Sequence, residues 1–340
     1  MHRVRVAQIG TGHDHAIYTF ISLIKNTTDF EVVGIAETNP ERIDALNTSP
    51  YCDYPHFTLQ ELLAMPELDA VAVESDEELA TDIAQKFLDR GVAVHLDKPG
   101  TADIPSFEKV INTARLKQLP LQMGYMYRYN PVIKQCLEMV RAGKLGKIYS
   151  VEAHMSVHHS VKKRKWLEKY PGGIMYFLGC HLIDLVLLFQ GMPDEVIPLN
   201  VKTHIENVDS TDYGFAVFKY ERGLSFIKTC SVEYNGFARR QLVIAGEKGT
   251  IVLKPLEAKY EPGTAADSVL HTPVSMLLAE NETDSSRDQA ECWDSGTYDR
   301  YDDMMHAFSL MVRGEEANPY SYDYELQLFK IVMQCCGMNE

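Results

Sequence analysis

Short apolar runs separated by segments of helical period fill the first 123 residues, and they constrain the fold more than any other feature. Two of these runs, Ala70–Val73 and Val92–Leu96, are rich in β-branched residues and contain no acid or lysine. Such runs are typical of parallel strands that are buried on both faces. The segment between them has apolar residues at helical spacing. We therefore predict a doubly wound (Rossmann) parallel sheet in an N-terminal α/β domain over residues 1–123.

The pattern changes after residue 123. Segments over residues 148–156, 195–203, 211–220, 224–234 and 240–245 alternate apolar and polar residues with period two. This period is typical of antiparallel strands with one buried face. Residues 255–297 are acidic and predict loops with one or two strands. A chain of 340 residues is also long for a single core. We predict a second α/β domain over residues 124–340, with a large, open, mainly antiparallel sheet.

Composition excludes several classes of partner. The net charge of −15 argues against binding to nucleic acid or to an anionic membrane surface. The seven cysteines are scattered and include no CxxC pair, which predicts a reduced, cytoplasmic protein. The sequence shows no signal peptide, and none of its apolar runs reaches membrane-spanning length. The net charge says little about a small-molecule substrate.

A glycine turn follows the first predicted strand. Val4–Ile9 runs into Gly10-Thr11-Gly12-His13-Asp14-His15, and a helical pattern begins directly after it. In this context Gly10 permits a tight turn, and Gly12 lets the backbone approach a pyrophosphate at the helix N-terminus. His13 and Asp14 could contact the cofactor, although Asp14 could equally cap the helix. His15 stands where the third glycine of the dinucleotide motif usually lies.

Two further strand ends carry candidate residues. Glu37 follows the second strand and could accept hydrogen bonds from an adenosine ribose. Its carboxylate would repel a 2′-phosphate, so it favours NAD over NADP, unless it is an ordinary acid that precedes a helix. Lys98 follows the strand at Val92–Leu96, where α/β folds place their ligands. Pro99 ends that strand because it lacks an N–H. The alternative for Lys98 is a solvated loop lysine.

Several separated motifs together resemble the Gfo/Idh/MocA oxidoreductase family across nearly the whole chain. In chain order the motifs are Gly10-Thr11-Gly12, Glu37, Asp97-Lys98-Pro99, the segment from Gly124 to Pro131, Gly143-Lys144-Leu145-Gly146-Lys147-Ile148, Gly172-Gly173 with Gly179, His181 and Asp184, and Gly246-Glu247-Lys248-Gly249. The resemblance implies a dinucleotide-binding domain followed by a domain whose open sheet binds substrate and mediates oligomerisation, as a homodimer or homotetramer. It also implies NAD(P)-linked oxidation of a secondary alcohol of a sugar, cyclitol or derivative.

The resemblance also implies roles for individual residues. Lys98 would polarise the reacting hydroxyl and His181 would be the general base, since histidine ordinarily titrates near neutrality. Arg128 would orient the substrate, and Asp184 could hold the tautomer of His181 or form a mere surface pair. The strand ends at Ser75 and at Asp97-Lys98-Pro99 would border the cofactor.

This chain departs from the family pattern at several positions. Phe177 stands four residues before His181, where many members carry an aspartate. The protein would then work with Lys98 and His181 alone, or with another group such as Tyr176. Asp97 replaces a glutamate. His158, in a segment with His154 and His159, could line the substrate pocket, but no acid or cysteine completes a metal set, and we predict no metal. Two alternatives stay open: a redox-assisted glycoside-cleaving enzyme, and a non-catalytic dinucleotide-binding sensor or regulator.

Overall fold

The computed structural model describes residues 2–259, 269–279 and 290–338. The chain forms two compact units, each described here by itself. The first comprises the residues up to Met126 together with Tyr301–Phe329, and the second comprises Tyr127–Arg300 together with the segment from Lys330 onward. The C-terminal part of the sequence therefore contributes to both units.

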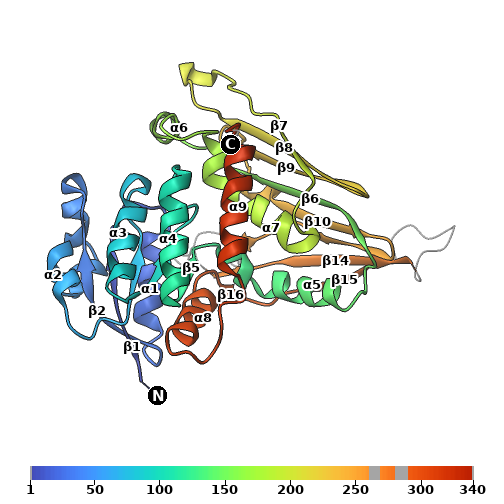
Figure 1. The fold of residues 1–340 in the computed structure, drawn as a ribbon. Helices are drawn as coiled ribbons and strands as arrows, with labels where there is room; N and C mark the ends of the chain where they lie inside the picture. Colours follow the sequence, from blue (N-terminus) through green and yellow to red (C-terminus); the bar gives the residue numbers. More distant parts are fainter. Residues whose placement is uncertain (1, 260–268, 280–289, 339–340) are drawn as a thin grey trace. The chain divides into compact units, whose positions relative to one another are not determined.

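The first unit is built on a parallel five-stranded sheet in the order β2-β1-β3-β4-β5 (Figure 1). Its strands are β1 (Val4–Ile9), β2 (Phe30–Ala36), β3 (Ala70–Val73), β4 (Ala93–Leu96) and β5 (Leu121–Met123). Every residue of β3 and β4 is buried, as the apolar runs predict. The predicted doubly wound sheet is thus confirmed. Because neighbouring parallel strands end at the same edge, the loops that follow β1, β3 and β4 lie together.

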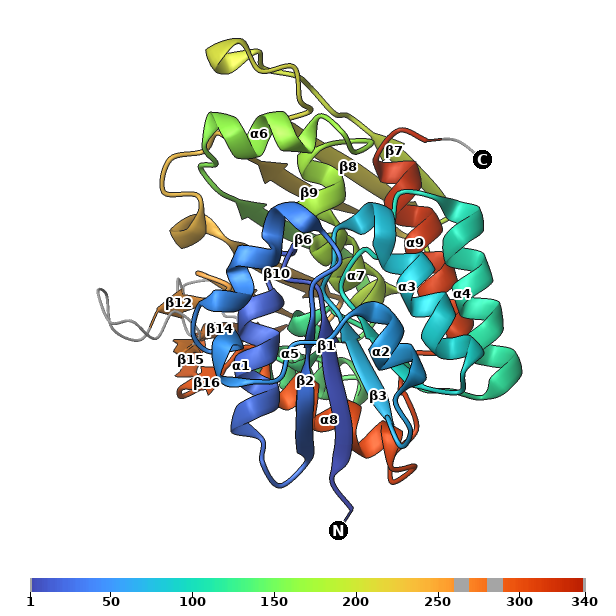
Figure 2. The same ribbon diagram turned by 90° about the vertical axis from the view of Figure 1, so that its left-hand side faces the viewer.

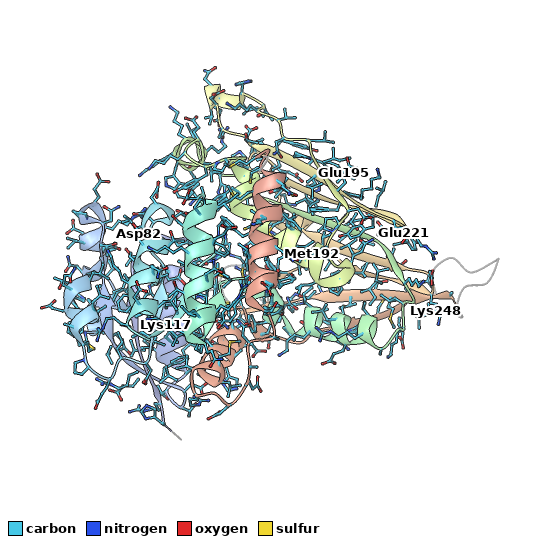
Figure 3. All side chains as sticks on the ribbon, viewed as in Figure 1. Asp82, Lys117, Met192, Glu195, Glu221 and Lys248 are labelled. Atoms are coloured by element: carbon cyan, nitrogen blue, oxygen red, sulfur yellow. The ribbon has the colours of Figure 1, made fainter. Side chains whose placement is uncertain are left out.

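Helices cover this sheet. The main ones are α1 (Ala16–Lys25), α2 (Leu59–Ala64), α3 (Glu77–Asp89), α4 (Ile104–Lys117) and α8 (Asp302–Val312). Figure 2 shows α1 on one side of β1 and α3 on the other. Asp82 and Lys117 are exposed on α3 and α4 (Figure 3). Although α8 comes nearly two hundred residues after β5, its Met304 carbonyl accepts a hydrogen bond of 3.0 Å from the Gln122 side chain. This bond helps to tie α8 to the sheet.

The second unit contains an eight-stranded sheet in the order β15-β14-β11-β10-β6-β9-β8-β7. Its pairs are antiparallel except for β6 with β9, so the prediction of a large, mainly antiparallel sheet is confirmed. The strands are β6 (Ile148–Ser156), β7 (Glu195–Pro198), β8 (Tyr213–Tyr220), β9 (Gly223–Cys230), β10 (Gln241–Gly246), β11 (Gly249–Leu253), β14 (Pro273–Leu278) and β15 (Glu291–Asp294).

Helices and a small sheet complete the second unit. The helices are α5 (Pro131–Arg141), α6 (Val161–Leu167), α7 (Cys180–Gln190) and part of α9 (Tyr322–Cys335), and a π-helical turn over Met175–Gly179 leads into α7. β12 (Ala258–Lys259), β13 (Val269–His271) and β16 (Tyr298–Asp299) form a separate sheet. Residues 255–297 thus hold more strands than the sequence predicts, while residues 260–268 and 280–289 lie outside the described part.

Two further predictions concern the redox state of the cysteines and the length of the apolar segments. All seven cysteines are present as free thiols. Within the residues that the structure describes, no helix is both long enough and apolar enough to cross a bilayer.

Candidate active site

The glycine turn after β1 is tight and lies against the residues that follow β3. Gly10 has a φ of +92°, and a Cβ at this position would lie 2.4 Å from the Cα of Ser75. Only glycine fits without backbone movement. The N–H groups of Gly12 and His13 donate to the Glu74 carbonyl over 3.1 and 3.3 Å, which fixes the turn to the end of β3. The turn therefore packs closely against the end of β3.

The helix after this turn begins differently from one alternative in the sequence analysis. α1 starts at Ala16 with His15 in the N-cap position, and no side chain caps it. Asp14 is exposed and does not serve as the N-cap, so that interpretation is wrong. Contact of Asp14 with a cofactor stays a prediction.

Glu37, at the end of β2, is bound to the glycine turn. One carboxylate oxygen accepts hydrogen bonds from the Thr11 N–H (2.7 Å) and hydroxyl (2.5 Å). The other accepts from the N–H groups of Thr38 and Asn39, over 2.7 and 2.8 Å. These four donors hold the carboxylate between β1 and β2, the two strand ends at which a dinucleotide ribose would be bound.

Two charged residues beside Glu37 were missed at the sequence level. Arg42 donates to Asp76 over 2.7 Å, and the Asn39 side chain donates to the same carboxylate over 2.8 Å. A Cβ on Gly12 would lie 2.9 Å from that carboxylate. A cation five residues after Glu37 was the available signal, because guanidinium groups bind phosphate well. Arg42 is thus a candidate ligand for a 2′-phosphate.

Lys98 and Asp97 follow β4 and are both buried, with exposed fractions of 1% and 6%. The Asp97 carboxylate contacts Nδ1 of His13 and lies 3.1 Å from Nδ1 of His15. The other ring nitrogen of His13, Nε2, lies 3.7 Å from the carboxylate of Glu77 in α3. The loops after β1 and β4 therefore meet in a cluster of ionisable side chains, and the solvated-loop alternative for Lys98 is wrong.

The charges of this cluster follow from burial and pairing. Burial would raise the pKa of Asp97, but the charges and hydrogen bonds of His13 and His15 outweigh it and hold the pKa well below its usual range. Burial disfavours a charge on both imidazoles. Asp97 outweighs burial at His13 and raises its pKa, whereas burial dominates at His15 and lowers its pKa to about 4. These directions favour an Asp97–His13 ion pair beside a neutral His15.

The same three side chains offer a compact set of donor atoms. One atom from each of His13, His15 and Asp97 lies within 4.8 Å of the other two, and no other such set occurs among the described residues. The N-terminus of α1 and the nearby Lys98 both disfavour a bound cation here. A hydrogen-bonded charge cluster accounts for the arrangement more simply than a metal site.

In the second unit, His181 lies in the first turn of α7 and is 1% exposed. Its ring packs edge-on against Tyr127, with 5.3 Å between centroids. The hydroxyl of Tyr127 donates to Glu257 over 2.7 Å, and Arg300 binds the same carboxylate through two hydrogen bonds of 2.7 and 2.9 Å. His181 thus has a neighbour that is itself held by a buried polar network.

Arg128 and Asp184 form a buried pair. The guanidinium Nε lies 3.0 and 3.1 Å from the two carboxylate oxygens, and Nη2 lies 2.8 Å from one of them. Both side chains are 1% exposed. The structure therefore joins two residues that the sequence analysis assigned separately to substrate and to His181.

Phe177 lies in an aromatic group one turn before His181. It is 4% exposed and meets Trp166 edge-on at 5.7 Å, while the Lys163 ammonium lies 4.4 Å from its ring centroid. Tyr176 is fully buried and stacks on Tyr170 at 5.1 Å. An aromatic ring and a nearby ammonium thus occupy the position at which the resemblance places an aspartate.

His158 and His154 have different neighbours. His158 is exposed and stacks on Tyr234 at 4.2 Å. His154 contacts the Ser156 hydroxyl over 2.9 Å and lies 3.4 Å from Glu233. A role for His158 in the substrate pocket stays a prediction.

Comparisons with known proteins cover both units. Residues 4–125 match the model of an oxidoreductase family with an NAD-binding Rossmann fold, and residues 133–252 match the GFO/IDH/MocA C-terminal domain. The chain is 26% identical to the uncharacterized oxidoreductase YhhX of Escherichia coli, over 78% of each protein. It is 27% identical to D-xylose 1-dehydrogenase (NADP(+)) 2 of Haloferax volcanii, over 58% of this chain and 60% of that protein.

A solved structure shows the same fold. KijD10, a 3-ketoreductase from Actinomadura kijaniata in complex with TDP-benzene and NADP, superposes with a TM-score of 0.76 at 21% identity. The match covers 97% of this chain and 96% of that one.

Proposed function

Because the chain belongs to the Gfo/Idh/MocA family of NAD(P)-binding oxidoreductases, we propose that it is an NAD-dependent enzyme. It transfers hydride between nicotinamide and a secondary alcohol or ketone of a sugar, cyclitol or derivative. The observation that carries this proposal is the buried Lys98 at the end of β4, next to Asp97, whose carboxylate contacts His13 and His15 of the glycine turn. A buried lysine is costly unless it has a partner or a task.

The residues of the first unit fit a dinucleotide. Gly10 and Gly12 permit a tight turn after β1, and Glu37 lies where it would accept the ribose hydroxyls. Glu37 supports NAD, and Arg42 is the feature that would support NADP. The nicotinamide supplies the hydride acceptor, whereas the protein supplies position and electrostatics.

Each oxidation moves one hydride and one proton. The carbinol hydrogen would leave with its bonding electrons as hydride, which bound nicotinamide would accept, and the O–H proton would pass to a base. We assign that base to His181 and propose that the Lys98 ammonium donates a hydrogen bond to the substrate oxygen, stabilising the negative charge that develops there. The Arg128–Asp184 pair would orient the substrate, and Tyr176 and His158 remain candidates for its pocket.

The test is a panel of sugars and cyclitols mixed with NAD or NADP while reduced cofactor is followed by absorbance. We expect turnover with NAD, and a loss of at least 100-fold in kcat for Lys98→Met and for His181→Asn. Lys86→Met, at an exposed position of α3, is the matched control. Unchanged turnover in Lys98→Met would refute the assignment.

One observation supports the alternative of a non-catalytic dinucleotide-binding sensor or regulator. Phe177 and its aromatic neighbours provide no carboxylate beside His181. Tight cofactor binding without turnover on any substrate would favour a sensor, and aglycone release without net cofactor reduction would favour glycoside cleavage. Oligomerisation through the sheet of the second unit and a cytoplasmic location also stay predictions.

A further inference from the structure

The histidines of the glycine turn distinguish this chain from an ordinary dinucleotide motif. A third glycine or another small residue would leave Asp97 without an imidazole partner from position 15. Here both His13 and His15 reach across from the turn to the carboxylate that directly precedes Lys98. Gly124, after β5, leaves the space that this carboxylate occupies, because a Cβ there would lie 2.7 Å from an Asp97 oxygen.

We propose that His13 and His15 are positioning residues that hold the Asp97 carboxylate ionised and oriented next to Lys98. The inference rests on the proposed role of Lys98 in the reaction. A buried ammonium loses stability with respect to the neutral amine unless an anion stays near it. Asp97 is adjacent to Lys98 in the chain. Contacts with the two imidazoles offset the cost of burying the Asp97 charge.

Other titratable groups surround the cluster. They are Glu74, which follows β3, His95 and Lys98 at the end of β4, Glu77 in the first turn of α3, and Tyr301, the N-cap of α8. Burial, followed by repulsion from Asp97, raises the pKa of Glu74, so this neighbour favours its neutral form. Glu77 lies on the far side of His13 and favours the imidazolium.

The arrangement divides the work between the two histidines. His13 lies between two carboxylates, those of Asp97 and Glu77, and carries the positive charge. His15 lies between Asp97 and the ring of Tyr301, 5.7 Å from its centroid, and acts as a neutral donor. A purely structural role would require only the hydrogen bonds and would not depend on the charge of His13.

The decisive variant is His13→Asn, because an asparagine amide can donate from the place of Nδ1 but carries no charge. Without the imidazolium, burial of Asp97 dominates, so the carboxyl protonates at higher pH. We expect the acid limb of the pH profile of kcat/KM to move up by at least one pH unit, with a smaller change at the optimum. His15→Asn should move it less. His2→Asn, at an exposed residue of the same unit, is the control.

A double variant separates positioning from an independent effect. If His13 acts through Asp97, then His13→Asn should change kcat/KM by less than twofold in an Asp97→Asn background. Two results would overturn the proposal. One is that the losses of kcat/KM in the two single variants multiply in the double variant. The other is that the acid limb of the pH profile does not move in His13→Asn.

A second measurement uses the wild-type protein. It requires no enzymatic turnover and does not depend on whether a variant folds. The ¹⁵N chemical shifts of the imidazoles in the cofactor-free wild-type protein should show His13 protonated and His15 neutral at pH 7. A neutral His13 would overturn the inference even if the enzyme is active. If the substrate panel shows no turnover while these shifts are as expected, the proposed function fails and the charge cluster stands.

Discussion

Replacement of Arg128 by methionine should strongly destabilise the second unit. The guanidinium makes contacts of 2.8 to 3.1 Å with Asp184, and water reaches neither side chain to any extent. Arg128→Met leaves a buried carboxylate without its cation, and such losses cost about 3–5 kcal/mol of unfolding free energy. Asp184→Leu should cost a similar amount for the converse reason.

The double variant Arg128→Met/Asp184→Leu removes both charges. Apolar pairs often replace a buried ion pair at little cost, so we expect it to be more stable than either single variant. Urea unfolding followed by tryptophan fluorescence measures this directly, because Trp166 and Trp293 both lie in the second unit. The exposed pair Lys219–Glu195, 3.1 Å apart, is the control and should cost under about 1 kcal/mol.

Two results would refute this reasoning. One is a single-variant loss below about 1 kcal/mol, which would mean that water or another group replaces the missing partner. The other is strict additivity of the two losses, which would mean that the side chains do not interact. If the single variants retained stability but lost substrate affinity, a direct role in binding would be favoured over a structural one.

Further predictions concern the first unit. Gly10→Ala should weaken cofactor binding by more than tenfold in calorimetry, because its Cβ would meet backbone at 2.4 Å. Gly91→Ala, which has a φ of +81° and no heavy atom within 4 Å, should not weaken it. Glu37→Gln should weaken NAD binding and narrow the ratio of NAD to NADP affinity, since the group that repels a 2′-phosphate is lost. A pH dependence of stability follows from His15, whose pKa falls from 6.5 to about 4 on folding. As the pH falls through this range, His15 is protonated in the unfolded state before it is protonated in the folded state. Acidification should therefore lower the unfolding free energy of the wild type by up to about 3 kcal/mol. His15→Asn should remove this contribution when urea unfolding is compared at pH 4.5 and 7.

The sequence by itself determined the parallel sheet and the position of the dinucleotide turn. These features depend on local patterns, because a strand buried on both faces needs an apolar run and a tight turn needs glycine. The apolar runs that became β3 and β4 were sufficient to predict the sheet. Gly10 and Glu37 lie at strand ends that the strand pattern alone brings to one edge, so their proximity could also be predicted.

Only the tertiary structure decided which charged groups meet and in which state they are held. Asp97 and His13 are 84 residues apart and Arg128 and Asp184 are 56 apart, so no local pattern pairs them. The return of residues 301–329 to the first unit is a packing result of the same kind. Burial and pairing then set protonation, since two imidazoles two residues apart contact the same carboxylate and yet their pKa values shift in opposite directions. Asp97 raises the pKa of His13, whereas burial outweighs Asp97 at His15 and lowers its pKa. Such shifts depend on desolvation and distance, which a sequence pattern does not contain.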